Sequence, residues 1–319
     1  MKTVLKPERL CLGDTIGIIA PASAPPDPKA VDRAAEALER HGFKPKLAKN
    51  VRERHGFLAG NDRDRAADVM RMFSDKKVKA ILCLRGGYGS ARLLHRLDYG
   101  IIRRQVKIFS GFSDITSLHC AFAKNVNMIS LHAPMLNGGL QAKDLPEFTR
   151  SSFFRTVMEP KPAGSITAGC GQKNISIVRG GLAEGRLIGG NLSVLCAAIG
   201  TPFEPSFKGR ILFFEDISEK PYRLDRMLTQ LLNAGILQQL AGIAVGVNQD
   251  CEDQKNSTAG EFRQSAADVV VERLSPLGVP VVMGLPFGHV NLNATIPVNA
   301  RARLDGDNGD LIITEAAVS

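Results

Sequence analysis

A serine that follows a short apolar run is the first residue in this sequence whose setting suggests chemistry. Val106, Ile108 and Phe109 form a short apolar run of strand type, Gly111 interrupts the run, and apolar residues recur at helical spacing from Ile115. Ser113 is therefore expected on a tight turn between a strand and a helix. A helix N-terminus offers unpaired N–H groups and the positive end of its dipole, so an oxyanion formed beside Ser113 would be stabilised there.

Ser113 also has a simpler interpretation. A serine that opens a helix is most often only its N-cap, and Asp114 would then complement the helix dipole in the first turn. The segment departs from the G-x-S-x-G nucleophile elbow, because Ile115 stands where the second glycine belongs. These residues alone favour the cap over the nucleophile.

A nucleophilic serine needs a base, and the base needs a group that orients it. Two of the six histidines are serious candidates: His132 at a predicted strand end and His289 in GLPFGH, beyond another strand. Glu215 and Asp216 end the apolar strand ILFF and are the candidate orienting carboxylates. Spacing alone does not choose among these residues.

Two glycine-rich loops resemble phosphate-binding loops at first sight. The loop at 86–89 lacks the spacing of a dinucleotide fingerprint, and neither it nor the loop at 189–191 carries the Lys-Ser/Thr pair of a P-loop. Glycine does let backbone N–H groups approach a ligand closely. Gly87, expected at a strand end in the same sheet as Ser113, could therefore supply an oxyanion donor.

The elements that must position these residues alternate between strands and helices. Strands are predicted at 15–20, 43–47, 78–84, 106–109 and 128–131, with helices at 31–41, within 57–75, and after 90 and 113. This order predicts a parallel sheet with helices on both faces, whose functional residues gather at the C-terminal strand ends. The residues expected at that edge are Pro21, Arg85, Ser113 and His132.

A change in composition predicts a second domain. Residues 1–140 form the predicted α/β domain, 141–174 a charged, Pro/Gly-rich linker with one short helix, and 175–319 the second domain. Further strands are predicted at 175–178, 210–214, 242–247 and 279–283, with a helix at 223–234 and antiparallel strands within 294–313.

Composition restricts the class of protein. The 319 residues are 44% hydrophobic and 23% charged, as in globular proteins of two domains. The net charge is +9, but lysine and arginine are spread along the chain and no basic block is interleaved with aromatic residues. We therefore expect no nucleic-acid partner, and a basic surface would favour encounter with a small anionic substrate.

The expected compartment is the cytoplasm. No uninterrupted apolar stretch follows the first basic residues, and no run is long enough to span a membrane, so neither a signal peptide nor a membrane anchor is predicted. The six cysteines lie far apart with no C-x-x-C pair, which indicates reduced thiols. Neither a metal nor another cofactor is expected.

Eight longer motifs occur in this chain, spread over nearly all of it. They are GDTIGIIAPAS (13–23), FLAGNDRDRAADV (57–69), RGGYGS (85–90), GFSDIT (111–116), HAPM (132–135), GRLIGGNLSVL (185–195), FFEDISEKPYRLDRML (213–228) and GLPFGH (284–289). Together, and in this order, they resemble the LD-carboxypeptidase or muramoyltetrapeptide carboxypeptidase family of serine peptidases, which includes microcin C self-immunity peptidases. One departure is Ala133, where the family usually has glycine.

The resemblance implies a fold and a set of site residues. The fold would be an N-terminal doubly wound, mostly parallel α/β domain joined to a smaller β-rich C-terminal domain, with the site in the cleft between them. Ser113 would be the nucleophile, His289 the general base and Glu215 its orienter, with the N–H groups of Gly87 and Asp114 as the oxyanion hole. Because homodimers are common in the family, a homodimer is expected.

The implied reaction is hydrolysis of the L,D-peptide bond that releases the terminal D-Ala of a murein tetrapeptide, in cytoplasmic peptidoglycan recycling. Arg85 could bind the terminal carboxylate of this substrate or hold its own loop through a carboxylate pair. Tyr88 and Asn191 are further candidates for substrate binding.

Two other functions remain open at this point. One is a related peptidase or amidase for microcin-like acyl-nucleotide adducts, against which the absence of tryptophan counts, since an indole could stack on a nucleobase. The other is a non-catalytic ligand-binding protein on the same frame. The presence of Ser113, Glu215 and His289 together argues against it, because a binding module needs no such set.

Overall fold

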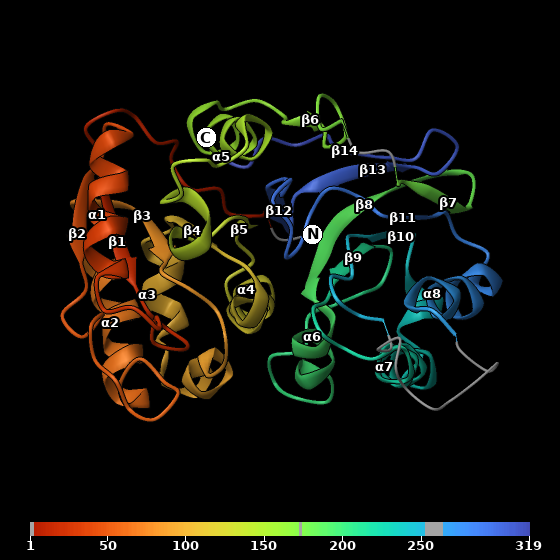
Figure 1. Cartoon of the computed structure of the whole chain (residues 1–319), viewed down its shortest axis with the longest axis horizontal. Helices are drawn as coiled ribbons and strands as arrows, with labels where there is room; N and C mark the ends of the chain where they lie inside the picture. Colours follow the sequence, from red (N-terminus) through yellow and green to blue (C-terminus); the bar gives the residue numbers. More distant parts are fainter. Residues whose placement is uncertain (1–2, 172–173, 253–263) are drawn as a thin grey trace.

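The computed structural model describes residues 3–171, 174–252 and 264–319, and it contains two sheets, each accompanied by helices (Figure 1). Each sheet has a hydrophobic core of its own. The predicted architecture of an α/β domain followed by a second sheet domain is confirmed.

The first sheet has six strands in the order β12-β5-β4-β3-β1-β2. The parallel strands are β1 (Thr15–Ile19), β2 (Lys44–Leu47), β3 (Val78–Cys83), β4 (Ile108–Gly111) and β5 (Ser130–His132). The helices of this half are α1 (Ala30–Arg40), α2 (Asp62–Ser74), α3 (Tyr99–Arg104) and α4 (Thr116–Asn125). Strand order reverses between β1 and β3, which is the switch point where doubly wound sheets place their sites.

The second sheet has eight strands in the order β6-β14-β13-β8-β9-β10-β11-β7. Its parallel centre consists of β8 (Leu182–Asn191), β9 (Ile211–Glu215), β10 (Gly242–Val245) and β11 (Val281–Met283). The antiparallel strands are β6 (Gly164–Ser165), β7 (Ser176–Arg179), β13 (Arg301–Asp305) and β14 (Asp310–Ile313). The helices are α6 (Leu192–Ala198), α7 (Pro221–Asn233) and α8 (Ala266–Leu274).

The segment predicted as a linker is largely part of the folded body. It contains α5 (Glu147–Met158), whose Phe153 and Val157 are buried in the core of the first sheet. β6 then pairs with β14 of the second sheet. Residues 172–173 of the predicted linker lie outside the described residues. The segment therefore connects the halves through buried contacts as well as through the chain.

The end of the chain returns to the first half. β12 (Ile296–Val298) pairs antiparallel with β5 and completes the first sheet. Ala317 and Val318 are buried in the same core. The two halves are thus joined by strand pairing and by apolar packing, and the functional residues at their junction are held from both sides.

Candidate active site

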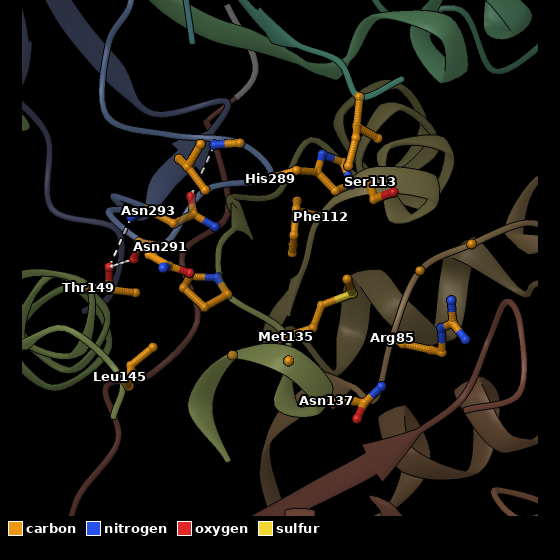
Figure 2. Close-up of a pocket in the computed structure, with 18 of the residues that line it drawn as sticks. Arg85, Phe112, Ser113, Met135, Asn137, Leu145, Thr149, His289, Asn291 and Asn293 are labelled. Atoms are coloured by element: carbon orange, nitrogen blue, oxygen red, sulfur yellow. Dashed lines mark hydrogen bonds between the residues drawn. The ribbon is translucent and has the colours of Figure 1, made fainter. Parts of the chain in front are cut away.

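A cavity of about 590 Å³ lies at the junction of the two halves (Figure 2). The loops after β3, β4 and β5 supply its first wall, with Arg85, Ser113 and Met135 among the lining residues. The loop after β11 supplies the opposite wall, from His289 to Asn293, and α5 contributes Thr149. The C-terminal strand ends therefore meet at one site, as the alternation of strands and helices predicted.

Ser113 occupies a strained backbone position. It follows the extended residue Phe112 after β4 and opens a short 3₁₀ turn that leads into α4, with φ at +63°. Such a left-handed conformation costs a non-glycine residue on the order of 1–3 kcal/mol and is concentrated at functional sites. No capping hydrogen bond from the Ser113 side chain is found in the described structure, so the N-cap interpretation does not account for this serine.

Gly86 makes room for Ser113. A Cβ atom on Gly86 would lie 3.0 Å from Cβ and 3.2 Å from Oγ of Ser113. Contacts this close are tighter than real Cβ atoms usually make. The missing side chain lets the loop after β3 pass directly beside the Ser113 hydroxyl.

His289 is hydrogen-bonded to a buried carboxylate. Its Nδ1 lies 2.6 Å from Oε2 of Glu215, which ends β9 and is fully buried, whereas the His289 side chain is 17% exposed. Because Nδ1–H donates to the carboxylate, Nε2 of the neutral ring is left as a proton acceptor. Ser113 and His289 both line the cavity, one from each half of the molecule (Figure 2).

Asn191 lies behind this pair and does not line the cavity. Its Nδ2 donates to Oδ1 of Asp216 at 2.9 Å and to Oε1 of Glu215 at 3.5 Å, while its Oδ1 caps α6 by accepting from the N–H of Val194. Burial raises the pKa of Asp216, and the neighbouring charge of Glu215 adds to this effect. The structure therefore gives Asn191 a supporting position beneath Glu215.

The carboxylate of Asp114 fastens the glycine-rich loop to the start of α4. It accepts hydrogen bonds from the N–H groups of Ser90 at 2.8 Å and Gly89 at 3.3 Å. Burial raises the pKa of Asp114, and these bonds oppose that rise. Arg65, only 1% exposed, holds the same loop by donating to the carbonyl of Gly89 at 2.9 Å. These bonds hold the end of the loop against the start of α4.

Gly87 has φ at +99°, and a Cβ atom there would lie 2.5 Å from Oγ of Ser23. Ser23 in turn accepts a hydrogen bond from the N–H of Tyr88 at 3.1 Å. Within the described ranges, neither the N–H of Gly87 nor that of Asp114 donates a hydrogen bond. Two backbone donors close to Ser113 are thus available to a ligand.

Arg85 and Tyr88 are placed differently from each other. Arg85 lines the cavity and donates from Nη1 to the carbonyl of Ala24 at 3.0 Å, and no carboxylate pairs with it in the part of the chain that the structure describes. Tyr88 lies outside the cavity lining, 52% exposed, with its ring centroid 5.6 Å from that of Phe57. Of the two roles expected for Arg85, the loop-holding carboxylate pair is not what the structure shows.

His132, the second histidine candidate, is fully buried among aromatic rings. Its ring centroid lies 5.6 Å from that of Phe112 and 5.4 Å from that of Phe213. Among the described residues neither ring nitrogen has a hydrogen-bond partner, and burial holds the pKa of His132 well below its ordinary value. His132 is therefore a neutral packing residue beneath the site.

The polar wall formed by Thr149, Asn291 and Asn293 was not predicted. Oγ1 of Thr149 donates to the carbonyl of Asn291 at 2.6 Å and accepts from the N–H of Asn293 at 2.9 Å. Oδ1 of Asn293 accepts from the N–H of Gly288 at 3.2 Å. The polar pattern HVNLN after His289 is the available sequence signal, whereas the contact with α5 joins residues more than 140 positions apart.

Three further features concern metals, membranes and thiols. Among the described residues, no group of three or more His, Cys, Asp or Glu side chains could hold a metal ion, and no helix is long and apolar enough to cross a membrane. Cys11 is exposed, and the other five cysteines are buried.

Comparison with known proteins gives consistent matches over the whole chain. Residues 16–133 match the family model of the LD-carboxypeptidase N-terminal domain, and residues 184–304 match that of the C-terminal domain. A relative named probable murein peptide carboxypeptidase from Bacillus subtilis is 40% identical over 98% of this chain and 95% of its own length.

Two solved structures are similar as well. A muramoyltetrapeptide carboxypeptidase from Oxalobacter formigenes is 34% identical with a TM-score of 0.82, covering 94% of this chain and 99% of the other. MccF in complex with glutamyl sulfamoyl guanosine is 25% identical with a TM-score of 0.88, covering 99% of this chain and all of the other. On these matches, the chain belongs to the LD-carboxypeptidase family of peptidases.

Proposed function

We propose that this protein is a serine carboxypeptidase that removes the terminal D-Ala from a murein tetrapeptide by hydrolysing its L,D-peptide bond. The observation that carries the proposal is the 2.6 Å hydrogen bond between His289 and the buried Glu215, on the same cavity as the strained Ser113. A ligand-binding protein would need neither the strain nor the oriented imidazole. The names of the relatives supply the substrate class.

The proposed mechanism follows from these positions. Nε2 of His289 takes the proton of Ser113 as Oγ attacks the scissile carbonyl, and Glu215 stabilises the imidazolium that forms. The N–H groups of Gly87 and Asp114 stabilise the tetrahedral oxyanion, and loss of one such donor typically costs about 2.7–4 kcal/mol. His289 then protonates the leaving D-Ala amine, and water hydrolyses the acyl-enzyme.

The remaining parts of the proposal concern the substrate terminus and the setting of the reaction. Arg85 is the fixed cation of the cavity wall among the described residues, which supports a role in binding the terminal carboxylate. Family resemblance is the basis for two further proposals: that the protein acts in cytoplasmic peptidoglycan recycling, and that it works as a homodimer.

The test is mass spectrometry of purified murein tetrapeptide incubated with the protein in the presence of a chelator. We expect the wild type to release one D-Ala, Ser113→Ala to release none, and Ser151→Ala to behave as the wild type. Ser151 is a suitable control because, in the part of the chain that the structure describes, its hydroxyl bonds only to carbonyls of its own helix. An intact tetrapeptide with the wild type would reject the murein assignment, and full activity of Ser113→Ala would reject the nucleophile.

A second candidate function is hydrolysis of acyl-nucleotide adducts, favoured by the likeness to MccF in complex with glutamyl sulfamoyl guanosine. Among the described lining residues of the cavity, Phe112 is the one aromatic residue besides His289. Its ring centroid lies 4.8 Å from that of His289. Incubation with aspartyl sulfamoyl adenosine separates the two candidates. Cleavage of this compound with no loss of D-Ala from tetrapeptide would establish the second function in place of the first.

A further inference from the structure

A second cavity, of about 840 Å³, lies at another part of the junction and shares no lining residue with the first. The first half supplies residues 3–6 and the C-terminal end of α4. The second half supplies residues of β8 and β13 and the segments that flank β9 and β14. Residues 3–6 line it together with the end of α4 and Arg186 of β8. No residue of the proposed peptidase mechanism lines this cavity.

The cavity is strongly basic. Five basic side chains and one acidic side chain line it: Lys6, Lys124, Arg186, Arg210, Arg301 and Glu315. The carboxylate of Glu315 is shared between Lys6 at 3.2 Å and Arg186 at 2.7 Å. In the described ranges no other carboxylate pairs with a basic side chain of this set. Unpaired charges in a recessed site are costly unless an anion compensates them.

Asn299 holds two of the arginines together. Its carbonyl accepts a hydrogen bond from Nη1 of Arg186 at 2.7 Å, and its Oδ1 accepts from Nη1 of Arg210 at 2.8 Å. Asn299 is fully buried in a left-handed conformation, with φ at +70°, and its Nδ2 donates to the carbonyl of Met128 at 3.3 Å. A strained, buried residue therefore fixes two like charges side by side.

The remaining donors of these arginines are available. Only Nη1 of each guanidinium is hydrogen-bonded within the described structure, so Nε and Nη2 of Arg186 and Arg210 have no protein acceptor. Burial, with the neighbouring charge of Arg186, lowers the pKa of Arg210 from its ordinary value. A guanidinium remains charged in proteins and presents a planar fork that matches phosphate oxygens.

We propose that this basic cavity binds a phosphate-bearing small molecule, with Arg186 and Arg210 on its phosphate groups. Arg186 and Arg210 are half-buried within a cavity, which suits a small ligand better than the surface of a macromolecule. An excess of four positive charges fits more than one phosphate group. The ligand would bridge Lys124 of the first half and the arginines of the second, and the proposal does not depend on the peptidase assignment.

The experiment is isothermal titration calorimetry with pyrophosphate, at constant ionic strength in a buffer free of phosphate and sulfate. We expect binding to the wild type and a dissociation constant at least tenfold higher for Arg210→Gln. Arg179→Gln is the matched control, because it removes the same charge from an exposed position on β7. It should bind as tightly as the wild type. No binding to the wild type, or equal weakening in both variants, would overturn the proposal.

Two further measurements complete the test. If circular dichroism shows that Arg210→Gln is unfolded, Lys124→Gln replaces it, because Lys124 is exposed on α4 and lines the cavity. A dissociation constant raised about threefold in Lys124→Gln supports the site, and an unchanged constant overturns it. ADP and UDP are titrated in parallel. Tighter binding than pyrophosphate identifies a nucleotide, and equal binding identifies the phosphates alone as the recognised group. Ser113→Ala should bind pyrophosphate as the wild type does.

Discussion

Glu215 and His289 meet across 74 positions of sequence, and their hydrogen bond fixes which nitrogen of the imidazole faces the cavity. The carboxylate has this role because it is buried at a strand end and is itself held by Asn191. Asp216, the adjacent carboxylate, turns to Asn191 and the N–H of Ser193 instead. Two neighbouring acids thus have different roles because successive residues at a strand end point in different directions.

Glu215→Gln is expected to lower kcat by about 10⁴-fold, as the equivalent amide substitution does in a serine protease triad, because the amide no longer favours the correct tautomer. Asp216→Asn is the matched control and should retain activity within tenfold of the wild type. Steady-state hydrolysis of tetrapeptide measures both. If Glu215→Gln keeps more than a tenth of wild-type kcat, Glu215 does not orient the base.

Because His119 is buried, we expect the free energy of unfolding to depend on pH. His119 is fully buried, with Nδ1 2.8 Å from Oγ of Ser130 and Nε2 2.8 Å from the carbonyl of Gly111, and burial lowers its pKa from 6.5 to about 4. The unfolded chain binds the proton first as pH falls, so stability present above pH 6.5 is lost between pH 6.5 and 4. This drop corresponds to roughly 3 kcal/mol.

Urea unfolding of the wild type and His119→Gln between pH 7 and 4.5 tests this expectation. The variant should be less stable at pH 7 and should lose less stability on acidification. His132 contributes a loss of the same direction in both proteins, since its pKa is also lowered by burial. Identical pH slopes for the two proteins would show that His119 does not carry the effect.

At the scale of elements, the loop after β3 sets the surroundings of the Ser113 hydroxyl. Gly86→Ala is expected to lower kcat on tetrapeptide at least tenfold, because its Cβ would lie 3.2 Å from Oγ of Ser113. Gly100→Ala is the control for loss of a glycine, because Gly100 is exposed on α3 without a positive φ and its Cβ would meet the ends of the Asp98 and Arg104 side chains. Unchanged kcat for Gly86→Ala would mean that the loop shifts to accommodate the added methyl group at little cost in free energy.

The strands that carry the site could be predicted from sequence. The apolar run before Ser113 became β4, and ILFF before Glu215 became β9 with nearly the predicted ends. These strands are short, continuous and buried, so their local pattern is enough. The tight turn at Ser113 could be predicted from the change from strand to helix periodicity. Its positive φ could not.

Long-range pairing could not be predicted in the same way. β12 is only three residues long, and its antiparallel pairing with β5 joins the end of the chain to the first sheet. The apolar side of α5 was hidden in a segment whose proline, glycine and charge content suggested a linker. Such contacts depend on how the two halves pack against each other, and the local composition of a segment carries no information on this packing. For Asn191, the motif at 185–195 marked the residue as a candidate, but its position beneath Glu215 could not be predicted from the sequence.

At the scale of the whole molecule, the last residues tie the two halves together. Val318 is buried in the first core, and the N–H and carbonyl of Ser319 pair with Pro7 and Arg9. Removal of residues 317–319 is expected to cost about 1.5–3 kcal/mol for the valine alone. Calorimetry should show one unfolding transition for the full chain and one, at lower temperature, for the truncated chain. Two separate transitions in the full chain would contradict this coupling.

The order in which the proposed triad enters the fold has a consequence during synthesis. Ser113 leaves the ribosome first, Glu215 follows, and His289 comes last of the three, just ahead of β12. Between residues 113 and 289, a growing chain therefore contains the proposed nucleophile without its proposed base. On this proposal, hydrolysis can begin only after residue 289 has been made and has packed beside Glu215.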